Sequence, residues 1–165
     1  MGFNGELINH EPLLTLARMS SATDDVILKI LSMKTIAVVG LSKDPSRPSN
    51  DVASYLKSHG YRIVPVNPTI DEVLGETSYK SLLDLPDQLR GQIDVVDIFR
   101  RAEDVPPIMD QAIQLHNAAG HPIAVWMQLG IVNEESARKA RESGLDVVMD
   151  RCMKIEHARR AGSSS

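Results

Sequence analysis

The feature that most constrains this chain is an alternation, from about Lys34 onward, of short β-branched runs with longer amphipathic stretches. Such an alternation is typical of a parallel sheet whose strands are joined by crossover helices. Each run is nearly continuous in apolar character, as strands buried on both faces of a sheet require. The predicted strands are Thr35–Val39, Arg62–Val66, Ile93–Ile98, Pro122–Trp126 and Asp146–Met149. The sequence therefore predicts an α/β fold with a five-stranded parallel sheet.

Three predicted helices between these strands are each followed by a glycine, the residue best suited to a left-handed C-cap. Pro106 and Pro107 fall in the first turn of the second helix, where a missing amide donor costs little. The helices and their glycines are Asn50–His59 with Gly60, Glu103–Ala119 with Gly120, and Glu134–Ser143 with Gly144.

Right-handed crossovers would wind these strands into an open, doubly wound sheet, for which we expect the strand order 3-2-1-4-5. The ligand crevice of such a sheet lies at the carboxyl ends of the strands, beside the first strand. The connection Asn67–Leu85 is less regular, and we expect one short helix near Ser81–Leu85.

The two ends of the chain lie outside the alternation. Glu11–Leu31 carries apolar residues that fit one or two helices lying on the domain. Lys154–Arg160 is basic and runs into small polar residues, which predicts a frayed tail. We therefore expect an N-terminal helical extension (1–33), an α/β domain (34–156) and a flexible tail (157–165).

Charge and composition exclude several classes of function. Lys plus Arg total 18 against 22 for Asp plus Glu, a net charge of -4 that disfavours binding of nucleic acid along the whole surface. Apolar runs reach only four or five residues, as in Ile123–Met127, whereas a membrane span needs about 20. Because no secretory signal is visible after Met1, we expect a cytoplasmic protein without nucleic-acid or membrane partners.

The loop that follows the first strand has the composition of a phosphate site. A helix beginning near its end would direct unpaired amides and the positive end of its dipole into the crevice, while hydroxyls and cations add donors. Asp44 and Asp51 oppose an anion, and a tight turn with a solvated loop is the alternative interpretation. The candidates in this loop are Gly40, Leu41, Ser42, Lys43, Arg47, Ser49 and Asn50.

The match to the dinucleotide fingerprint is poor, because Ser42 and Pro45 stand where its second and third glycines belong. The second strand ends in neutral Asn67 rather than the acidic residue that binds the ribose diol of NAD. A phosphorylated ribose could approach Asn67 without repulsion, and Pro68 could present a flat apolar ring to adenine. The alternative is that Asn67 and Pro68 form only a turn.

The third and fourth strands end in further candidates. Arg100 and Arg101 could bind phosphates, while Phe99 could line the crevice. The alternative is a solvated charge pair with Phe99 in the core. Trp126 fits a core position and a crevice wall equally well, and Gln128 follows it at the same edge.

Taken in order, the strand ends resemble the stand-alone CoA-binding proteins, which are similar to the CoA-binding domain of succinyl-CoA synthetase and acyl-CoA synthetases. The resemblance covers about Lys34 to Glu156. It implies a Rossmann-like domain that holds coenzyme A or an acyl-CoA across the strand ends. Leu41 replaces an alanine of many relatives, a side-chain change that leaves backbone contacts to phosphate intact. The matching segments are Val38–Ser42, Pro65–Pro68, Asp97–Arg100, Trp126–Gly130 and Asp150–Cys152.

The chain carries few residues suited to catalysis. Its five histidines have no metal-ligand spacing, and no hydrolase or triphosphatase motif occurs. Cys152 is the only cysteine, which excludes an internal disulfide or a multi-thiolate zinc site. It is a candidate redox thiol beside Arg151 and Lys154, or else a residue without chemistry.

We therefore expect non-covalent binding of CoA or an acyl-CoA, with no catalytic residue and no metal, in a protein that is a binding module rather than an enzyme. The competing interpretations are a small NAD(P)-dependent oxidoreductase, one component of a split acyl-CoA synthetase, and a regulatory module whose ligand controls a partner. Selective binding of NAD would favour the first, and a neighbouring reading frame for a ligase domain the second. A homodimer and an unidentified protein partner both remain open.

Overall fold

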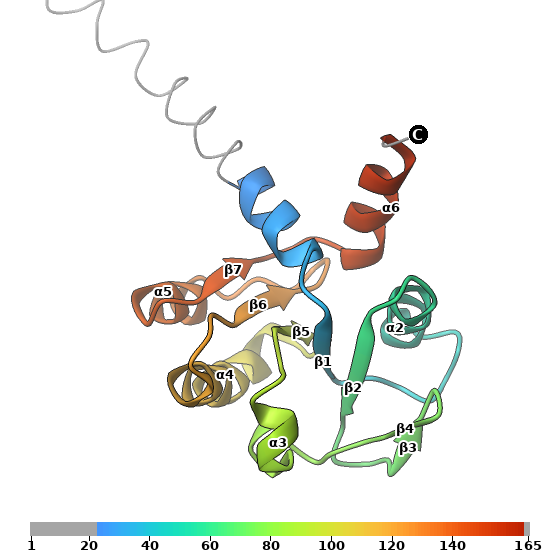
Figure 1. Cartoon of the computed structure of the whole chain (residues 1–165), viewed down its shortest axis with the longest axis horizontal. Coiled ribbons are helices and arrows are strands. Elements are labelled where there is room, and N and C mark those ends of the chain that lie inside the picture. Colours follow the sequence, from blue (N-terminus) through green and yellow to red (C-terminus); the bar gives the residue numbers. More distant parts are fainter. Residues whose placement is uncertain (1–22, 164–165) are drawn as a thin grey trace, which may run out of the picture.

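The structure, a computed structural model, describes residues 23–163 (Figure 1). All strands of the main sheet run parallel to their neighbours. Every residue of the three central strands is buried, which explains their continuous apolar character. The strands are β1 (Thr35–Val39), β2 (Arg62–Val66), β5 (Val95–Ile98), β6 (Ala124–Met127) and β7 (Asp146–Val148). The predicted α/β, Rossmann-like fold is confirmed.

The order of the strands differs from the expected one. The sheet reads β2-β1-β5-β6-β7, so the third strand of the sheet lies between the first and the fourth rather than outside the second. Pro65 explains the difference, because a residue without an amide hydrogen suits an edge strand such as β2. Among residues 23–163, Tyr79 is the one residue that pairs with the backbone on the outer side of β2, its amide donating to Pro65 O at 3.0 Å.

Two helical layers cover the sheet (Figure 1). One face carries α2 (Pro48–Ser58), α6 (Met153–Ser163) and the helix of residues 23–31. The other face carries α4 (Val105–Ala119) and α5 (Glu134–Glu142). Successive side chains of β1 point to opposite faces of the sheet, so Val38 packs towards α2 and Val39 towards α4. Both faces of the sheet are therefore buried, as doubly wound topology requires.

The ends of the helices follow the predicted punctuation closely. Gly120 and Gly144 have positive φ at the ends of α4 and α5, and the prolines lie in the first turn of α4. However, α2 begins at Pro48, two residues earlier than expected, and Arg47 is its N-cap residue. Proline at the first helical position explains the earlier start, since its fixed φ suits that position.

The connection from β2 to β5 holds more regular structure than the sequence indicated. A hairpin of β3 (Glu72–Val73) and β4 (Glu76–Thr77) turns at two residues of positive φ, as a tight hairpin requires. A short 3-10 helix, η1 (Leu82–Asp84), lies where a short helix was expected, and α3 (Asp87–Arg90) follows it. A second 3-10 helix, η2 (Ala102–Asp104), leads into α4.

The two ends of the described chain both pack on the domain. Ile27 and Ile30 of the first helix are fully buried against the sheet, and the helices expected before Thr23 lie outside the described residues. The prediction of a frayed tail over residues 154–160 is wrong, because this segment belongs to α6. Met153 anchors that helix in the core, and Glu156 pairs with Arg160 of the basic segment and with Arg151, which precedes the helix.

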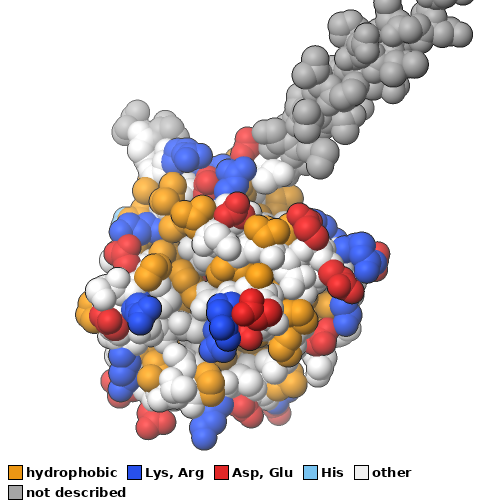
Figure 2. Space-filling view, turned by 180° about the vertical axis from the view of Figure 1, so that it is seen from behind, with side chains coloured by type: hydrophobic (Ala, Val, Ile, Leu, Met, Phe, Trp, Pro, Cys, Tyr) orange, Lys and Arg blue, Asp and Glu red, His pale blue; other side chains and the backbone are white. Residues whose placement is uncertain are grey.

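The outer surface shows no dominant charge. On the face seen in Figure 2, Lys and Arg side chains alternate with Asp and Glu, and no patch of one sign covers it. Between residues 23 and 163, no helix is long and apolar enough to cross a membrane.

Candidate functional site

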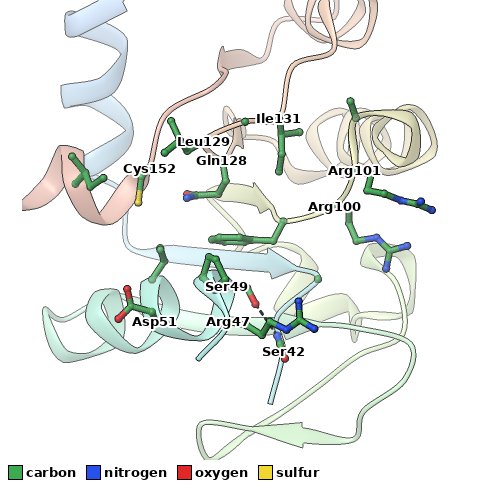
Figure 3. Close-up of a pocket in the computed structure, with 17 residues that line it drawn as sticks. Ser42, Arg47, Ser49, Asp51, Arg100, Arg101, Gln128, Leu129, Ile131 and Cys152 are labelled. Atoms are coloured by element: carbon green, nitrogen blue, oxygen red, sulfur yellow. Dashed lines mark hydrogen bonds between the residues drawn. The ribbon is translucent and has the colours of Figure 1, made fainter. Parts of the chain in front are cut away.

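A cleft of about 830 Å³ opens at the carboxyl ends of β1, β5 and β6 (Figure 3). The chain leaves β1 for β2 on one side and β5 continues the sheet on the other, so this is the point at which the winding reverses. Its walls come from the start of α2, the loops after β5 and β6, and the start of α6. The lining residues are Gly40, Ser42, Arg47, Pro48, Ser49, Asp51, Val52, Phe99, Arg100, Arg101, Ala102, Gln128, Leu129, Gly130, Ile131, Cys152 and Ile155.

A second, smaller cavity of about 300 Å³ adjoins the cleft on the α4 side of the sheet edge. The two cavities share Gly40 and Arg100 in their linings. Pro68 and Lys80 line the second cavity together with residues of η1, η2 and α4. A ligand longer than either cavity could therefore extend across the sheet edge from one to the other.

Gly40 lies at the boundary between the two cavities. Its φ is +88°, and a Cβ built there would overlap with the carbonyl oxygen of Phe99. Its amide donates to Val66 O at 2.8 Å. The glycine thus lets the chain leave β1 while remaining in contact with the ends of both neighbouring strands.

The loop after Gly40 is folded onto the start of α2 by its own polar side chains. Ser49 Oγ accepts a hydrogen bond from the amide of Ser42 at 3.0 Å (Figure 3), and Asn50 Nδ2 donates to Ser42 O at 2.8 Å. Both side chains are buried. Asn50 therefore shapes the loop and does not line either cavity.

Asn67 joins the loops that follow β1 and β2. Its Nδ2 donates to Leu41 O at 3.0 Å, and its Oδ1 accepts from the amide and hydroxyl of Thr69 at 3.0 and 2.8 Å. Both polar atoms of the Asn67 side chain are therefore already hydrogen-bonded within the protein. The structure thus places Asn67 as a support for the site, behind its lining.

Three cations from two loops lie at one end of the cleft. Arg47 and Arg100 extend towards the same space, whereas Arg101 points away from it (Figure 3) and its side chain is 77% exposed. Arg100 forms a long pair with Asp104, at 3.4 Å, and Arg101 pairs with Glu103 and Asp104 at 3.5 Å. The charge of Arg47 lies close enough to Asp44 to help lower the pKa of that carboxyl.

The carboxylate of Asp44, in the loop after Gly40, accepts hydrogen bonds from within its own turn. The amide of Ser46 donates to Asp44 at 2.9 Å and its hydroxyl at 2.8 Å, and these bonds hold the pKa of Asp44 below its ordinary value. Asp44 is thus an ionised acceptor for its own turn, a common role of aspartate in loops.

The far wall of the cleft is formed by links between the ends of β6 and β7. Gln128 Oε1 accepts from the amide of Met153 at 3.1 Å, which caps the start of α6, and Asp150 Oδ1 accepts from the amide of Gly130 at 2.7 Å. Trp126 is fully buried and its Nε1 donates to Arg151 O at 2.7 Å. Of the two interpretations of Trp126, the core position is therefore the observed one.

The structure brings most of the predicted residues to one place. Leu41, Asn50, Asn67 and Trp126 lie behind the lining, Lys43 is exposed outside both cavities, and Pro68 lines the second cavity. Those that line the cleft are Gly40, Ser42, Arg47, Ser49, Phe99, Arg100, Arg101, Gln128 and Cys152.

Sequence reasoning missed the apolar part of the lining. Leu129, Ile131 and Val52 contribute to it, and so does Ile155 of α6. The sequence did contain a signal for this wall, because Leu129 and Ile131 flank Gly130 in the loop after the fourth strand, where polar residues are more usual. Ile155 was missed because its segment was taken for a tail.

A family model described as "CoA binding domain" matches residues 34–158. The chain is 42% identical over 125 residues to the uncharacterized protein YneT of Bacillus subtilis (strain 168), covering 76% of this chain and 86% of that protein. A hypothetical protein from Pyrococcus horikoshii OT3 has a similar structure, with a TM-score of 0.73 and 43% identity, covering 82% of this chain and 90% of that one.

A much larger protein matches over a shorter stretch. The chain is 35% identical over 83 residues to acetate–CoA ligase (ADP-forming) II of Archaeoglobus fulgidus. The match covers 49% of this chain and 12% of that ligase.

Proposed function

The chain belongs to the CoA-binding domain family, and from this premise we propose that it binds coenzyme A or an acyl-CoA non-covalently in the two adjoining cavities. The observation that carries the proposal is that Arg47, from the start of α2, and Arg100, from the loop after β5, line one cleft at the point where the winding reverses. Open α/β sheets bind their ligands at this point.

The diphosphate of CoA fits the cationic end of the cleft. The first turn of α2 directs the positive end of the helix dipole there, and its N-cap residue makes no side-chain capping bond. The long contact between Arg100 and Asp104 is a surface pair of small energy, which a phosphate oxygen can replace with a stronger charge-assisted bond. Arg47 and Arg100 would then hold the diphosphate from opposite sides.

The adenosine half fits the second cavity. Pro68 offers an apolar surface for the base, and Lys80 offers a cation for the phosphate that CoA carries on its ribose. The acidic side chains of that cavity, Glu103 and Asp104, pair with arginines and do not face the site unpaired. The pantetheine arm would then run along Phe99 in the larger cleft, towards Gln128 and Cys152.

The similarity to the ADP-forming acetate–CoA ligase favours a second candidate, in which this chain is the CoA-binding component of a split acyl-CoA synthetase. The chain covers 12% of that ligase, so the remaining chemistry would come from other chains. A neighbouring reading frame encoding a ligase or ATP-grasp domain, and a complex of the two products, would support this candidate. Both candidates require the same CoA site.

The site is tested by calorimetric titration of CoA into Arg47→Ala and Arg100→Ala variants. Each change removes a charge-assisted contact and should weaken binding by about 1 to 3 kcal/mol. Arg138→Ala is the matched control, because Arg138 lies on α5 outside both cavities and pairs only at the surface. Unchanged affinity in both variants would contradict the placement, and absence of CoA binding by the wild type would contradict the function.

A further inference from the structure

The two ends of the cleft differ in chemical character. Ser42, Arg47 and Arg100 make up the cationic end, while Leu129 and Cys152 lie at the other end (Figure 3). A single cavity thus joins a site for anions to a site for apolar groups.

The apolar side chains that line the cleft come from three separate elements. Val52 comes from α2, Leu129 and Ile131 from the loop after β6, and Ile155 from α6. Leu129 is 64% exposed and Ile155 49% exposed, and they are two of the four large hydrophobic side chains that are exposed among the described residues. Exposed apolar side chains that gather in a cavity mark a surface that a ligand or a partner covers.

The loop that presents Leu129 is held in place by the fold. Gly130, the next residue, donates to Asp150 Oδ1 at 2.7 Å, and the amide of Ile131 donates to Gln128 O at 2.9 Å in a tight turn. Leu129 is therefore presented by a loop with fixed ends rather than by a segment that could turn its side chain into the core.

An ion pair between α2 and α6 lies beside this end of the cleft. Asp51 lines the cleft here, and Lys154 of α6 donates to its two carboxylate oxygens at 3.1 and 3.0 Å. An additional carboxylate would meet the charge of Asp51 and would lose water without gaining a partner. A neutral, apolar group suits this environment better than an acidic one.

The orientation of the ligand follows from these differences. On the premise that the cleft binds CoA as proposed above, the phosphates occupy the cationic end and the thiol end of the ligand reaches Leu129 and Ile155. Free CoA ends there in a thiol and would leave both side chains exposed. We infer that the ligand of this site is an acyl-CoA thioester with an uncharged acyl chain that packs against Leu129 and Ile155.

Calorimetric titration of the full chain with CoA, acetyl-, butanoyl-, hexanoyl- and succinyl-CoA tests this inference. Burial of each added methylene should raise the affinity about two- to fourfold, so hexanoyl-CoA should bind at least about tenfold more tightly than acetyl-CoA. Succinyl-CoA matches butanoyl-CoA in carbon number but ends in a carboxylate, and it should bind about tenfold more weakly.

Two variants assign the effect to the named side chains. In a Leu129→Ser, Ile155→Ser double variant, the gain in affinity from acetyl-CoA to hexanoyl-CoA, each measured on the same variant, should fall below about threefold. Leu28→Ser is the control, since Leu28 is 53% exposed but lies outside the cleft, and it should keep the full gain.

The outcomes separate this inference from the proposed function. Wild-type protein that binds CoA with equal affinity at every chain length would overturn the acyl site and leave CoA binding intact. Failure to bind any CoA species would overturn both. Equal affinity at every chain length, together with a dimer that dissociates in the double variant, would show that a second copy covers Leu129 and Ile155 instead.

Discussion

At the scale of single residues, polar side chains at the strand ends mostly join one loop to another. Ser49, Asn67 and Gln128 each bond a backbone group of a different segment, and these bonds give the cleft its shape. The sequence showed that such residues follow the strands. It could not show which of them contact a ligand, because Asn67 and Gln128 find partners about 25 residues away.

Gly40 provides a stability prediction. Gly40→Ala should lower the free energy of unfolding by at least about 2 kcal/mol, because the alanine must adopt positive φ and its Cβ would meet the carbonyl of Phe99. Gly60→Ala is the control, with φ of +92° and no atom within 4 Å of the added Cβ, and it should cost only about 1 kcal/mol. Urea denaturation measures both, and equal losses would show that the contact with Phe99 is unimportant.

Asp97 is the most unusual buried residue of the sheet. It lies between Val38 and Trp126 on neighbouring strands and is fully buried. No group among residues 23–163 donates to either of its carboxylate oxygens. Burial raises the pKa of Asp97 well above its ordinary value, because the fold excludes water from its carboxyl group and this favours the neutral form.

The raised pKa of Asp97 predicts how stability changes with pH. The folded state keeps a proton that the unfolded chain releases above about pH 3.9, so the contribution of Asp97 declines as pH rises towards its folded pKa. Asp97→Asn removes this dependence, and the variant should gain stability relative to wild type as pH rises from 4 to 7. Urea denaturation at each pH measures the difference. A constant difference would show that Asp97 ionises alike in both states.

At the scale of elements, α6 shows how a buried charge anchors a helix. The side chain of Glu156 is 4% exposed and pairs with Arg160 at 2.6 Å and Arg151 at 3.3 Å. Although burial alone would raise it, the bonds from Arg160 and Arg151 hold the pKa of Glu156 below its ordinary value. These ion pairs hold α6 against the domain, and α6 in turn places Ile155 in the lining of the cleft.

Glu156→Gln should lower the free energy of unfolding by about 1 to 3 kcal/mol at pH 7, because charge-assisted bonds become neutral ones. The folded pKa is depressed, so the wild-type advantage is present above about pH 4.3 and is lost as pH falls through the folded pKa. Glu142→Gln, in the exposed pair with Arg138, should change stability by less than about 0.5 kcal/mol. Denaturation at pH 7 and pH 3 tests both, and equal losses at the two pH values would contradict an ionised Glu156.

The elements differ in how well the sequence predicted them. Strands and glycine-ended helices depend on local patterns, and their positions were predicted to within two residues at most ends. Strand order depends on pairing between distant segments, and Pro65 was the local sign that the second strand lies at an edge. The helix α6 was missed because its stability depends on Glu156, Arg151 and the core contact of Met153.

At the scale of the whole molecule, the site exists because the topology brings loops from five parts of the chain to one edge. The position of the crevice beside β1 was predictable from the doubly wound pattern, even though the strand order was not. The apolar end of the cleft was not predictable, because it requires α6 to pack beside the loop after β6. The fold class and the cationic end of the cleft thus follow from local sequence patterns, whereas the strand order and the apolar wall depend on tertiary packing.

The central claim is that this cleft binds CoA species in preference to dinucleotides. The most direct test is calorimetric titration of the purified chain with CoA, hexanoyl-CoA, NAD and NADP at one ionic strength, after native mass spectrometry has shown that no ligand is carried over. The account predicts that CoA species bind at least about 100-fold more tightly than NAD or NADP. Tighter binding of NAD or NADP would contradict it and would assign the cationic end of the cleft to a dinucleotide.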